Sequence, residues 1–386
     1  MHETETAAQE PTRQLTRELK VVFGERATDS VCVPLLHNPV NAVTSGVWRV
    51  RAGARSAVVK VVSGAGHAEG SWSASDDTRH WNYWRREAFL YEEGLQRVWE
   101  RHGITGPRLL AALERADGDI ALWLQDVPGE PATAWPVQRH GAHAERLGAA
   151  HGAQLSSGPL DRPWLSRGFL RGYLASKSLG WELLDDDEAW RQPAVRDHFP
   201  AGLRSKMVRL HHDRAWFLDV MESLPRVFSH LDMWPANVLA RGNDSVVLDW
   251  AFAGDGTLGE DIGNYIPDTV FDHFMPAARL PELAATVYSA YLRGLRGAGW
   301  RGDERLVRLA VCASAVKYDW LTAQMLLRAS DARHLAYGRR ETVSLQHRYR
   351  ERGTALAFLA DWADEARTLA PLLGFPAPPS GSNTSG

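Results

Sequence analysis

Three oxygen-bearing side chains in and after the segment SHLDMWPANV, residues 229–238, have the types and spacing that chemistry on phosphate requires. Asp232 and Asn237 lie five residues apart, and Asp249 follows twelve residues later, at the end of the apolar run VVLD. A carboxylate can accept the proton of an attacking hydroxyl, and carboxylate and amide oxygens are the ligands that Mg²⁺ prefers. The spacing therefore predicts phosphoryl transfer, with Asp232 as the base and Asn237 and Asp249 as metal ligands.

Each of these side chains also has a purely structural explanation. Asp232 could cap a turn, Asn237 could form an Asx-turn, and Asp249 could end a strand. Any one residue alone is explained in this way. All three at this spacing, with a strand before the last, favour the functional interpretation.

Two short motifs carry a family resemblance: His230-x-Asp232-x4-Asn237 and Leu248-Asp249-Trp250. They resemble the catalytic and metal-binding loops of the protein-kinase-like superfamily and, more closely, of the aminoglycoside phosphotransferase family. Two positions depart from the usual pattern. Leu231 stands where the family usually has glycine, and Trp250-Ala251 follows the metal aspartate where protein kinases have Phe-Gly.

The resemblance implies an α+β fold of the two-lobed protein-kinase-like type, with a small β-rich N-lobe and a larger, mostly helical C-lobe. It implies ATP and Mg²⁺ as cofactors, and it implies that residues 230–237 form the catalytic loop. In this loop His230 is expected to brace the backbone rather than to transfer protons. An aspartate that supports the loop is expected at Asp261.

The elements that must position these residues begin with a small sheet. GVWRVRAGARSAVVKVV, residues 46–62, predicts a β-hairpin, and IALWLQDV, residues 120–127, predicts a further strand. Between them, apolar residues recur at helical spacing over residues 81–103, which predicts one long helix that ends at Gly103.

A lysine of the small lobe provides an independent test of the resemblance. The family needs a lysine on a strand to hold the α- and β-phosphates, and a glutamate on the next helix to hold the lysine. Lys60 has the context VVKVV, and Glu87 lies 27 residues further on, within the predicted helix. Glu92 and Glu93 remain alternative partners, because sequence does not fix the helical phase. The structural alternative for Lys60 is a solubilising residue at a strand edge.

The loop expected to cover the nucleotide lacks the GxGxxG pattern. The stretch before the hairpin instead offers Asn41, Thr44, Ser45 and Gly46. The resemblance places the nucleotide-covering turn here, with Ser45 and Gly46 beside the phosphates, since backbone N–H groups and small hydroxyls can contact phosphate.

The resemblance also places the adenine-binding hinge after the predicted strand 120–127. Backbone groups from Gln125 to Val127 are expected to bind adenine, and Trp123 or Leu124 to line the slot around it.

Beyond the turn-rich stretch 128–136 the chain is predicted to be mostly helical. Helices are predicted at 143–155, 206–224, 280–299, 305–330 and 341–366. Residues 226–250 are the exception, with short extended segments around a Gly-Asn turn. The predicted organisation is a disordered N-terminus 1–12, a nucleotide-binding N-lobe 13–127, a C-lobe 128–376 with the catalytic loop and acceptor site, and a disordered tail 377–386.

Composition excludes several other classes of protein. The chain has 386 residues and a formal net charge of −3, which is unlike a dedicated nucleic-acid binder. Cys32 and Cys312 are the only cysteines, so there is no disulfide framework or cysteine metal cluster. The N-terminus does not resemble a signal peptide, and no apolar run reaches membrane-spanning length. A cytoplasmic protein is expected, and the sequence does not indicate an oligomeric state.

The histidines show no metal-binding pattern. His140, His143 and His151, and the pair His211-His212, lack matching carboxylates or cysteines, so a solvated helix surface is predicted for them.

The expected reaction is ATP- and Mg²⁺-dependent transfer of the γ-phosphate to a hydroxyl of a small molecule, such as an aminoglycoside-like antibiotic or a metabolite. The acidic stretch LDDDEAW, residues 184–190, would suit a cationic acceptor, or would be a loop or a helix N-terminus. Such an enzyme would serve antibiotic resistance or natural-product biosynthesis.

Two other functions remain open. The enzyme would phosphorylate Ser or Thr of a precursor peptide, from which a partner lyase eliminates phosphate; a helical lobe in a chain with 16 tryptophans does not look tuned only for polycationic sugars. Alternatively, the chain is a nucleotide-binding pseudokinase that acts as a partner protein. The presence of Asp232, Asn237 and Asp249 argues against that last function.

Overall fold

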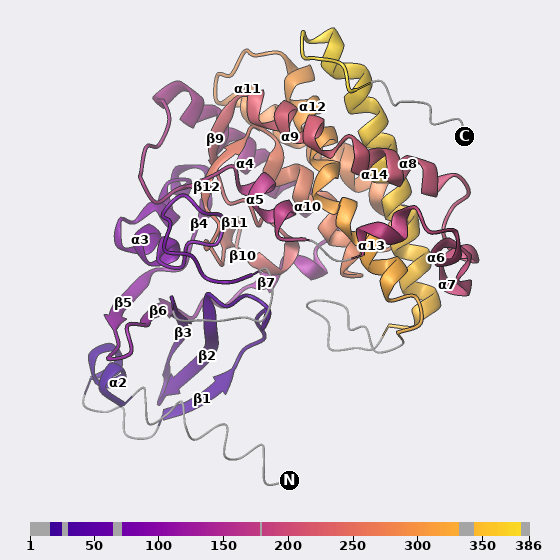
Figure 1. Cartoon of the computed structure of the whole chain (residues 1–386). Helices are drawn as coiled ribbons and strands as arrows, with labels where there is room; N and C mark the ends of the chain where they lie inside the picture. The colour runs from indigo at the N-terminus through magenta and orange to yellow at the C-terminus, as the bar shows by residue number, and fades with distance from the viewer. Residues whose placement is uncertain (1–15, 25–29, 65–71, 178–179, 332–342, 380–386) are drawn as a thin grey trace. The chain divides into compact units, whose positions relative to one another are not determined.

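The structure, a computed structural model, describes residues 16–24, 30–64, 72–177, 180–331 and 343–379. Its contacts divide the chain into two compact units. Unit 1 comprises residues 1–130, 162–166 and 239–253, and unit 2 comprises the remainder (Figure 1). The predicted disordered N-terminus and most of the predicted disordered tail lie outside the described residues. Each lobe predicted from the sequence was one continuous stretch of chain. Unit 1, in contrast, also includes two short segments from later in the chain, residues 162–166 and 239–253.

A five-stranded antiparallel sheet dominates unit 1, with strand order β1–β2–β3–β6–β5. The strands are β1 Ser30–Pro34, β2 Thr44–Ala52, β3 Arg55–Val62, β5 Leu109–Glu114 and β6 Ile120–Gln125. The hairpin predicted for residues 46–62 is confirmed as β2–β3, with Gly53 at φ 59° in its turn.

One face of this sheet is covered by a helix that the sequence did not reveal, α2 (Thr16–Phe23). Leu19 and Phe23 pack on a face that includes Val59 and Trp123. Successive strand residues point to opposite faces, so Lys60 lies on the other face, opposite Leu122 in the register. Of the two residues expected to line an adenine slot, Trp123 lies on the covered face, where its indole N–H donates to Glu18 (2.9 Å), and the expectation for Leu124 stays a prediction.

The single long helix predicted for residues 81–103 is wrong. Helix α3 spans only Arg86–Glu92, and two short 3-10 turns follow, at Leu95–Arg97 and Glu100–His102. Gly94 takes a left-handed conformation (φ 73°), which ends the helix. The redirected chain buries Trp99 against Trp250, with ring centroids 5.2 Å apart.

A second, smaller sheet leads to Asp249. It has the order β4–β11–β10–β7, with bounds Ile104–Thr105, Asp244–Val247, Val238–Arg241 and Glu130–Pro131 respectively. The predicted Gly-Asn turn is confirmed between β10 and β11, where Gly242 has φ 60°. Strand β11 places Asp249 two residues beyond its end.

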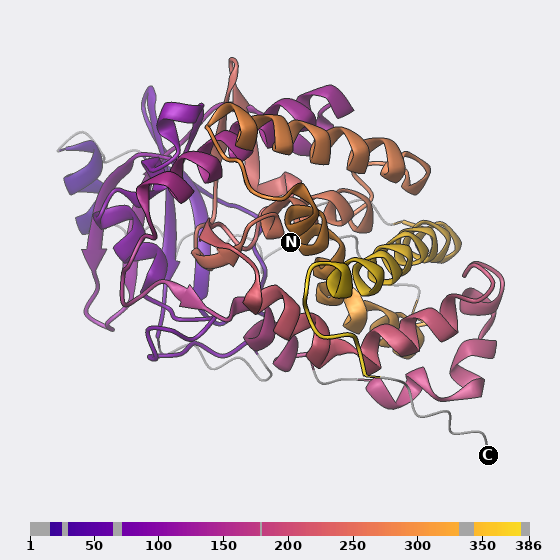
Figure 2. The same ribbon diagram turned by 90° about the horizontal axis from the view of Figure 1, so that it is seen from above.

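Unit 2 is mainly helical, and Figures 1 and 2 show its last helix, α14, in yellow alongside the others. Its helices are α4 Val137–Ser157, α5 Phe169–Ala175, α6 Asp187–Arg191, α7 Pro193–Arg196, α8 Leu203–His212, α9 Arg214–Ser223, α10 Glu260–Phe271, α11 Leu280–Gly297, α12 Glu304–Ala313, α13 Asp319–Leu327 and α14 Leu345–Leu372. The helices predicted at 143–155, 280–299 and 341–366 correspond to α4, α11 and α14, and residues 341–342 of the last range lie outside the described residues. Among the described residues, no helix is long and apolar enough to span a membrane.

Glycines allow α4 and α11 to approach closely. A Cβ at Gly148 would lie 2.1 Å from the carbonyl oxygen of Tyr291, and one at Gly294 would lie 1.9 Å from that of Glu145. Both distances are far below van der Waals contact, so only glycine fits at these two positions.

Two other predicted helices are each divided in the structure. Residues 206–224 form parts of α8 and α9, which break at Asp213, a buried residue whose carboxylate accepts from Arg367 Nε on α14 (2.7 Å). Residues 305–330 form α12, a 3-10 turn at Ser314–Tyr318, and α13. At the break between α8 and α9, Asp213 forms an ion pair with Arg367 of α14. The spacing of apolar residues in the sequence does not reveal such a tertiary contact.

The predicted solvated surface position of His140, His143 and His151 is wrong, because all three are buried on α4. Rings from other helices surround them. His140 Nδ1 lies 2.7 Å from the Tyr265 hydroxyl, and His151 Nδ1 lies 2.7 Å from that of Tyr291. Burial lowers the pKa of His140 to about 4 and the pKa values of His143 and His151 to about 3. These are neutral core residues.

The catalytic-loop motif follows a short β-strand of unit 2. Strand β9 (Arg226–Ser229) pairs antiparallel with β12 (Gly254–Thr257), with Ser229 opposite Gly254. The motif residue His230 directly follows β9.

Candidate active site

Lys60 lies between two carboxylates of unit 1. Its Nζ is 2.6 Å from Oε2 of Glu87 and 2.7 Å from Oδ1 of Asp249. The structure therefore selects Glu87 among the three glutamates that sequence left open. Glu93 instead pairs with Arg162 at 2.5 Å, and Glu92 is exposed.

The environment keeps Lys60 charged. Burial alone would lower its pKa, but the carboxylates of Asp249 and Glu87 outweigh burial and raise the pKa above its ordinary value. The two carboxylates differ in exposure, since the Glu87 side chain is 2% exposed and that of Asp249 is 45% exposed. Asp249 is thus the one that can meet a ligand from solvent.

Helix α3 also holds the backbone that follows Asp249. Glu87 Oε1 accepts from the Trp250 N–H (3.0 Å), and Arg86 donates to the carbonyl of Ala251 (3.2 Å). Asp249 itself has φ 57°, a left-handed conformation that costs a non-glycine residue about 1 kcal/mol. Contacts to the backbone after Asp249, together with the ion pair of its side chain with Lys60, therefore hold a conformation that a non-glycine residue does not favour by itself.

Arg86 is a positioning residue that sequence reasoning missed. It is fully buried, and within the described part of the chain it donates to five backbone carbonyls, those of Thr78, His80, Trp81, Trp164 and Ala251. The only sequence signal is its place beside Glu87 in WRRE, and an arginine in a charged run gives no hint of burial. Its five N–H donors suit this task because carbonyls from three chain segments converge on it.

The catalytic-loop backbone is held by one buried carboxylate. Asp261 accepts from the N–H of His230 (3.0 Å) and from that of Leu231 (2.8 Å). Leu231 has φ 66°, so the position where the family usually has glycine is a left-handed one. Burial raises the pKa of Asp261 to about 7, and the two N–H donors oppose this rise.

His230, Asp232 and Asn237 form one hydrogen-bonded loop in unit 2. His230 is fully buried, and its Nδ1 accepts from the Asp232 N–H (3.3 Å). The Asn237 amide donates through Nδ2 to the Asp232 carbonyl (3.1 Å). His230 therefore contacts backbone, and the Asn237 side chain is oriented with its nitrogen toward Asp232.

The donors at Asn237 and Asp249 are chemically suited to Mg²⁺. With Nδ2 of Asn237 directed at Asp232, the other amide atom is a hard oxygen, and Asp249 supplies a partly exposed carboxylate. Among the described residues, no group of three or more His, Cys, Asp or Glu side chains is placed to hold a metal ion.

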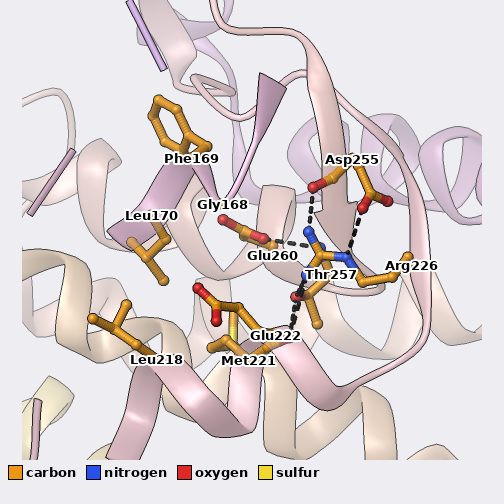
Figure 3. Close-up of a pocket in the computed structure, with 10 residues that line it drawn as sticks. All are labelled: Gly168, Phe169, Leu170, Leu218, Met221, Glu222, Arg226, Asp255, Thr257 and Glu260. Carbon is orange, nitrogen blue, oxygen red and sulfur yellow. Dashed lines mark hydrogen bonds and ion pairs between the residues drawn. The ribbon is translucent and has the colours of Figure 1, made fainter. Parts of the chain in front are cut away.

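Arg226 holds strand β9, which precedes the catalytic-loop motif, against β12 (Figure 3). It donates to the Thr257 hydroxyl (2.7 Å) and lies 3.3 Å from the Asp255 carboxylate, both on β12. Glu260 in turn accepts from the Thr257 N–H (2.9 Å). The cavity beside these residues holds about 10 Å³, the space of one water molecule, so this cluster is structural.

The predicted nucleotide contacts need two corrections. Ser45 and Gly46 lie within β2 rather than in a turn before it, at an irregularity between Thr44 and Gly46. A Cβ at Gly46 would lie 2.1 Å from the Trp48 ring, so side-chain packing requires this glycine. The Gln125 N–H donates to the Arg108 carbonyl (2.9 Å) and is therefore engaged within the protein. Val127 is buried, and its adenine contact stays a prediction.

The chain belongs to the phosphotransferase enzyme family (APH), whose model matches residues 39–304. This confirms the family resemblance, and it makes the chain a phosphotransferase that acts on a hydroxyl group. A comparison with curated protein sequences gives no match.

Solved structures share the fold. An amicoumacin kinase (hAmiN) is 14% identical, with 97% of this chain and 98% of that chain covered and a TM-score of 0.52. An aminopropanol kinase associated with a microcompartment is 13% identical, with 94% and 98% covered and a TM-score of 0.51. A choline/ethanolamine kinase family protein from Mesorhizobium loti is 16% identical, with 93% and 98% covered and a TM-score of 0.50. The predicted α+β kinase-like fold is confirmed.

Proposed function

We propose that the protein is an ATP- and Mg²⁺-dependent O-phosphotransferase that acts on a small molecule. The observation that carries this proposal is the ammonium of Lys60 between Glu87 and Asp249, at 2.6 and 2.7 Å. A cation fixed in this way can bind phosphate oxygens without reorganising. The amicoumacin kinase with the same fold was solved with AMP-PNP and Ca²⁺, which supports a nucleotide and a divalent metal here.

Each predicted residue then has one task toward the nucleotide. Lys60 binds the phosphates and Glu87 holds Lys60. Asn237 and Asp249 would provide oxygen ligands to Mg²⁺, which would neutralise phosphate charge when bound. Ser45 and Gly46 would lie beside the phosphates. Gln125 and Val127 would border adenine, with the carbonyl of Gln125 rather than its N–H as the group that could take part.

Asp232 accepts the proton of the acceptor hydroxyl. Its backbone is held on both sides, because its N–H donates to His230 and its carbonyl accepts from Asn237. These bonds hold the backbone that carries the carboxylate before an acceptor binds, which reduces the reorganisation needed during transfer.

We infer a small hydroxylated acceptor, an antibiotic or a metabolite, rather than a precursor peptide. The solved relatives are described as kinases of amicoumacin, choline or ethanolamine, and aminopropanol, all of them small molecules.

The test is Asp232→Asn, assayed for ADP formation and acceptor phosphorylation over a panel of hydroxylated compounds. We expect transfer to fall by at least about 100-fold while MgATP affinity changes little, because a base contributes about 10²–10⁴ to rate and is not needed to hold nucleotide. Asp244→Asn, at an exposed position, is the matched control. Wild-type turnover in Asp232→Asn would overturn the role of Asp232. Absence of both MgATP binding and transfer in the wild type would overturn the proposed function.

A further inference from the structure

The connection between β1 and β2, residues 35–43, is held by a bracing segment that lies between β3 and α3, residues 72–83. The Asn82 side chain donates through Nδ2 to Oδ1 of Asn41 (3.1 Å), and the Ala42 N–H donates to the carbonyl of Trp72 (3.1 Å). Asn82 is 2% exposed and Asn41 is 8% exposed, so the bond between their side chains is shielded from water. The connection is therefore tied to the bracing segment at two neighbouring positions.

Asn41 also organises the turn that leads into β2. Its Oδ1 accepts from the Val43 N–H (3.2 Å), which forms an Asx-turn, and its carbonyl accepts from the Thr44 N–H (3.2 Å). An amide oxygen has two lone pairs, and here one takes a donor from the turn and the other takes the donor from Asn82. The Asn82 side chain therefore fixes the orientation of the amide on which this turn depends.

Asn82 is also the residue at which the bracing segment closes on itself. Its Nδ2 lies 3.0 Å from the carbonyl oxygen of Trp72 and 3.0 Å from that of Ser73. Its own carbonyl accepts from the Ser75 N–H (3.1 Å). One buried side chain thus orders the bracing segment and joins it to the β1–β2 connection.

The bracing segment is anchored on the backbone that follows Asp249. The ring of Trp81 lies 5.7 Å from that of Phe252, centroid to centroid, and both residues are buried. The carbonyl of Trp81 accepts from Arg86 (2.8 Å), whose guanidinium also donates to the carbonyl of Ala251 (3.2 Å). The β1–β2 connection is therefore linked, through the bracing segment, to the part of unit 1 that carries the candidate metal ligand.

Resting on the proposed phosphotransferase function, in which the β1–β2 connection covers the phosphates, we propose that Asn82 is a positioning residue for the nucleotide. It holds the covering turn in place through Asn41. A glycine-rich loop loses much conformational entropy when it closes over phosphates, whereas the bonds that order this turn come from the protein itself. The nucleotide then does not have to order the turn, and it binds more tightly for that reason.

Two variants remove the link from opposite ends. Asn82→Ala removes the donor to Asn41. Asn41→Ser keeps a side-chain oxygen for the Val43 N–H but is too short to reach Asn82, and it carries the test if Asn82→Ala fails to fold. The matched control is Asn243→Ala, at an exposed asparagine between β10 and β11.

The measurements do not require a known acceptor. Calorimetry gives the Kd of AMP-PNP with Mg²⁺ and, separately, the Kd of adenosine, which has no phosphates for the turn to cover. Hydrogen–deuterium exchange of peptides that contain residues 38–44 reports the order of the turn, with and without AMP-PNP. Thermal unfolding shows which variants are folded at the temperature of the experiment.

We expect the Kd of AMP-PNP to rise about tenfold in each single variant, because the turn is then ordered in only about a tenth of the molecules. The affinity for adenosine should stay nearly unchanged. The double variant should bind no more weakly than the poorer single variant, since both changes remove the same bond. Exchange at residues 38–44 should become faster in the variants and slow again with saturating AMP-PNP, and the control should match the wild type.

Three outcomes overturn the inference and leave the proposed function intact. The first is an unchanged Kd of AMP-PNP in a folded variant at Asn82 or Asn41. The second is an equal loss of affinity for AMP-PNP and adenosine, which would show general damage to unit 1 rather than loss of a phosphate-covering turn. The third is unchanged exchange at residues 38–44. Failure of the wild type to bind AMP-PNP with Mg²⁺ would count against the proposed function, and the inference would fall with it.

Discussion

The carboxylate of Asp261 accepts a hydrogen bond from the backbone N–H of Leu231 at 2.8 Å, and Leu231 has a left-handed conformation with φ 66°. One side chain on α10 thereby holds the residue directly before the candidate base. The same carboxylate also accepts from the His230 N–H. The position of Asp232 therefore depends on a residue that need not touch substrate.

Replacing Asp261 by asparagine tests this dependence. An amide has one acceptor oxygen where the carboxylate has two, so one loop N–H would face an NH₂ group. We expect the free energy of unfolding to fall by about 1–3 kcal/mol, the usual cost of a buried donor without an acceptor. We also expect kcat to fall more than the affinity for nucleotide. Thermal unfolding and steady-state kinetics measure both, and an unchanged kcat would contradict the positioning role.

The left-handed Leu231 predicts an unusual order of stability for two variants. Leu231→Ala and Leu231→Gly both lose a fully buried side chain, at about 2–5 kcal/mol. Only glycine relieves the backbone strain, so Leu231→Gly should be more stable than Leu231→Ala by about 1 kcal/mol. Denaturant unfolding measures the difference. At Leu147, buried inside α4, the order should be the opposite, with alanine better than glycine.

Variants at Lys60 should show that its ammonium group contributes to the stability of the fold and to the affinity for MgATP through different interactions. In Lys60→Met, Glu87 is left buried without its cation, and we expect a loss of about 3–5 kcal/mol in the free energy of unfolding. MgATP affinity should fall at least tenfold. The double variant Lys60→Met/Glu87→Leu should recover much of the stability and none of the affinity. Lys20→Met, at an exposed position of α2, serves as the control, and recovered affinity in the double variant would refute the role of Lys60.

The buried histidines of α4 predict sensitivity to acid. The pKa of His143 falls from 6.5 to about 3, mainly because of burial, so between these pH values the unfolded chain binds a proton that the folded chain does not. The stabilising contribution is complete above pH 6.5 and is lost as pH falls toward 3. His143→Leu should reduce the slope of unfolding free energy against pH by up to about 1.4 kcal/mol per pH unit. Denaturant unfolding from pH 7 to pH 4 measures this slope, and an unchanged slope in His143→Leu would contradict the role of this histidine.

The sequence was informative where local pattern decides the structure. The β2–β3 hairpin follows from two segments rich in β-branched residues joined at Ala52-Gly53, and the role of Lys60 was predicted from its place in that hairpin. The choice of Glu87 over Glu92 and Glu93 was not predictable, because it depends on the orientation of α3.

Tertiary contacts explain the remaining differences. The run of apolar residues at 81–103 fits a helix, but Gly94 ends the helix and Trp99 gains more by packing on Trp250. The histidines of α4 look polar in sequence, yet partners such as Tyr265 and Tyr291, more than 100 residues away, bury them. Arg86 gave no usable signal, because its partners are backbone carbonyls, which sequence does not distinguish.

The contacts of Arg86 also predict that segments far apart in the sequence unfold locally together. Its guanidinium joins the carbonyl of Ala251, 165 residues away in sequence, with that of Trp164, 78 residues away, and with the nearby loop at residues 78–81. Segments tied to one buried cation cannot open one at a time without leaving its donors unpaired. Their amide protons should therefore exchange with deuterium as a single cooperative group, with Asp249 at its edge.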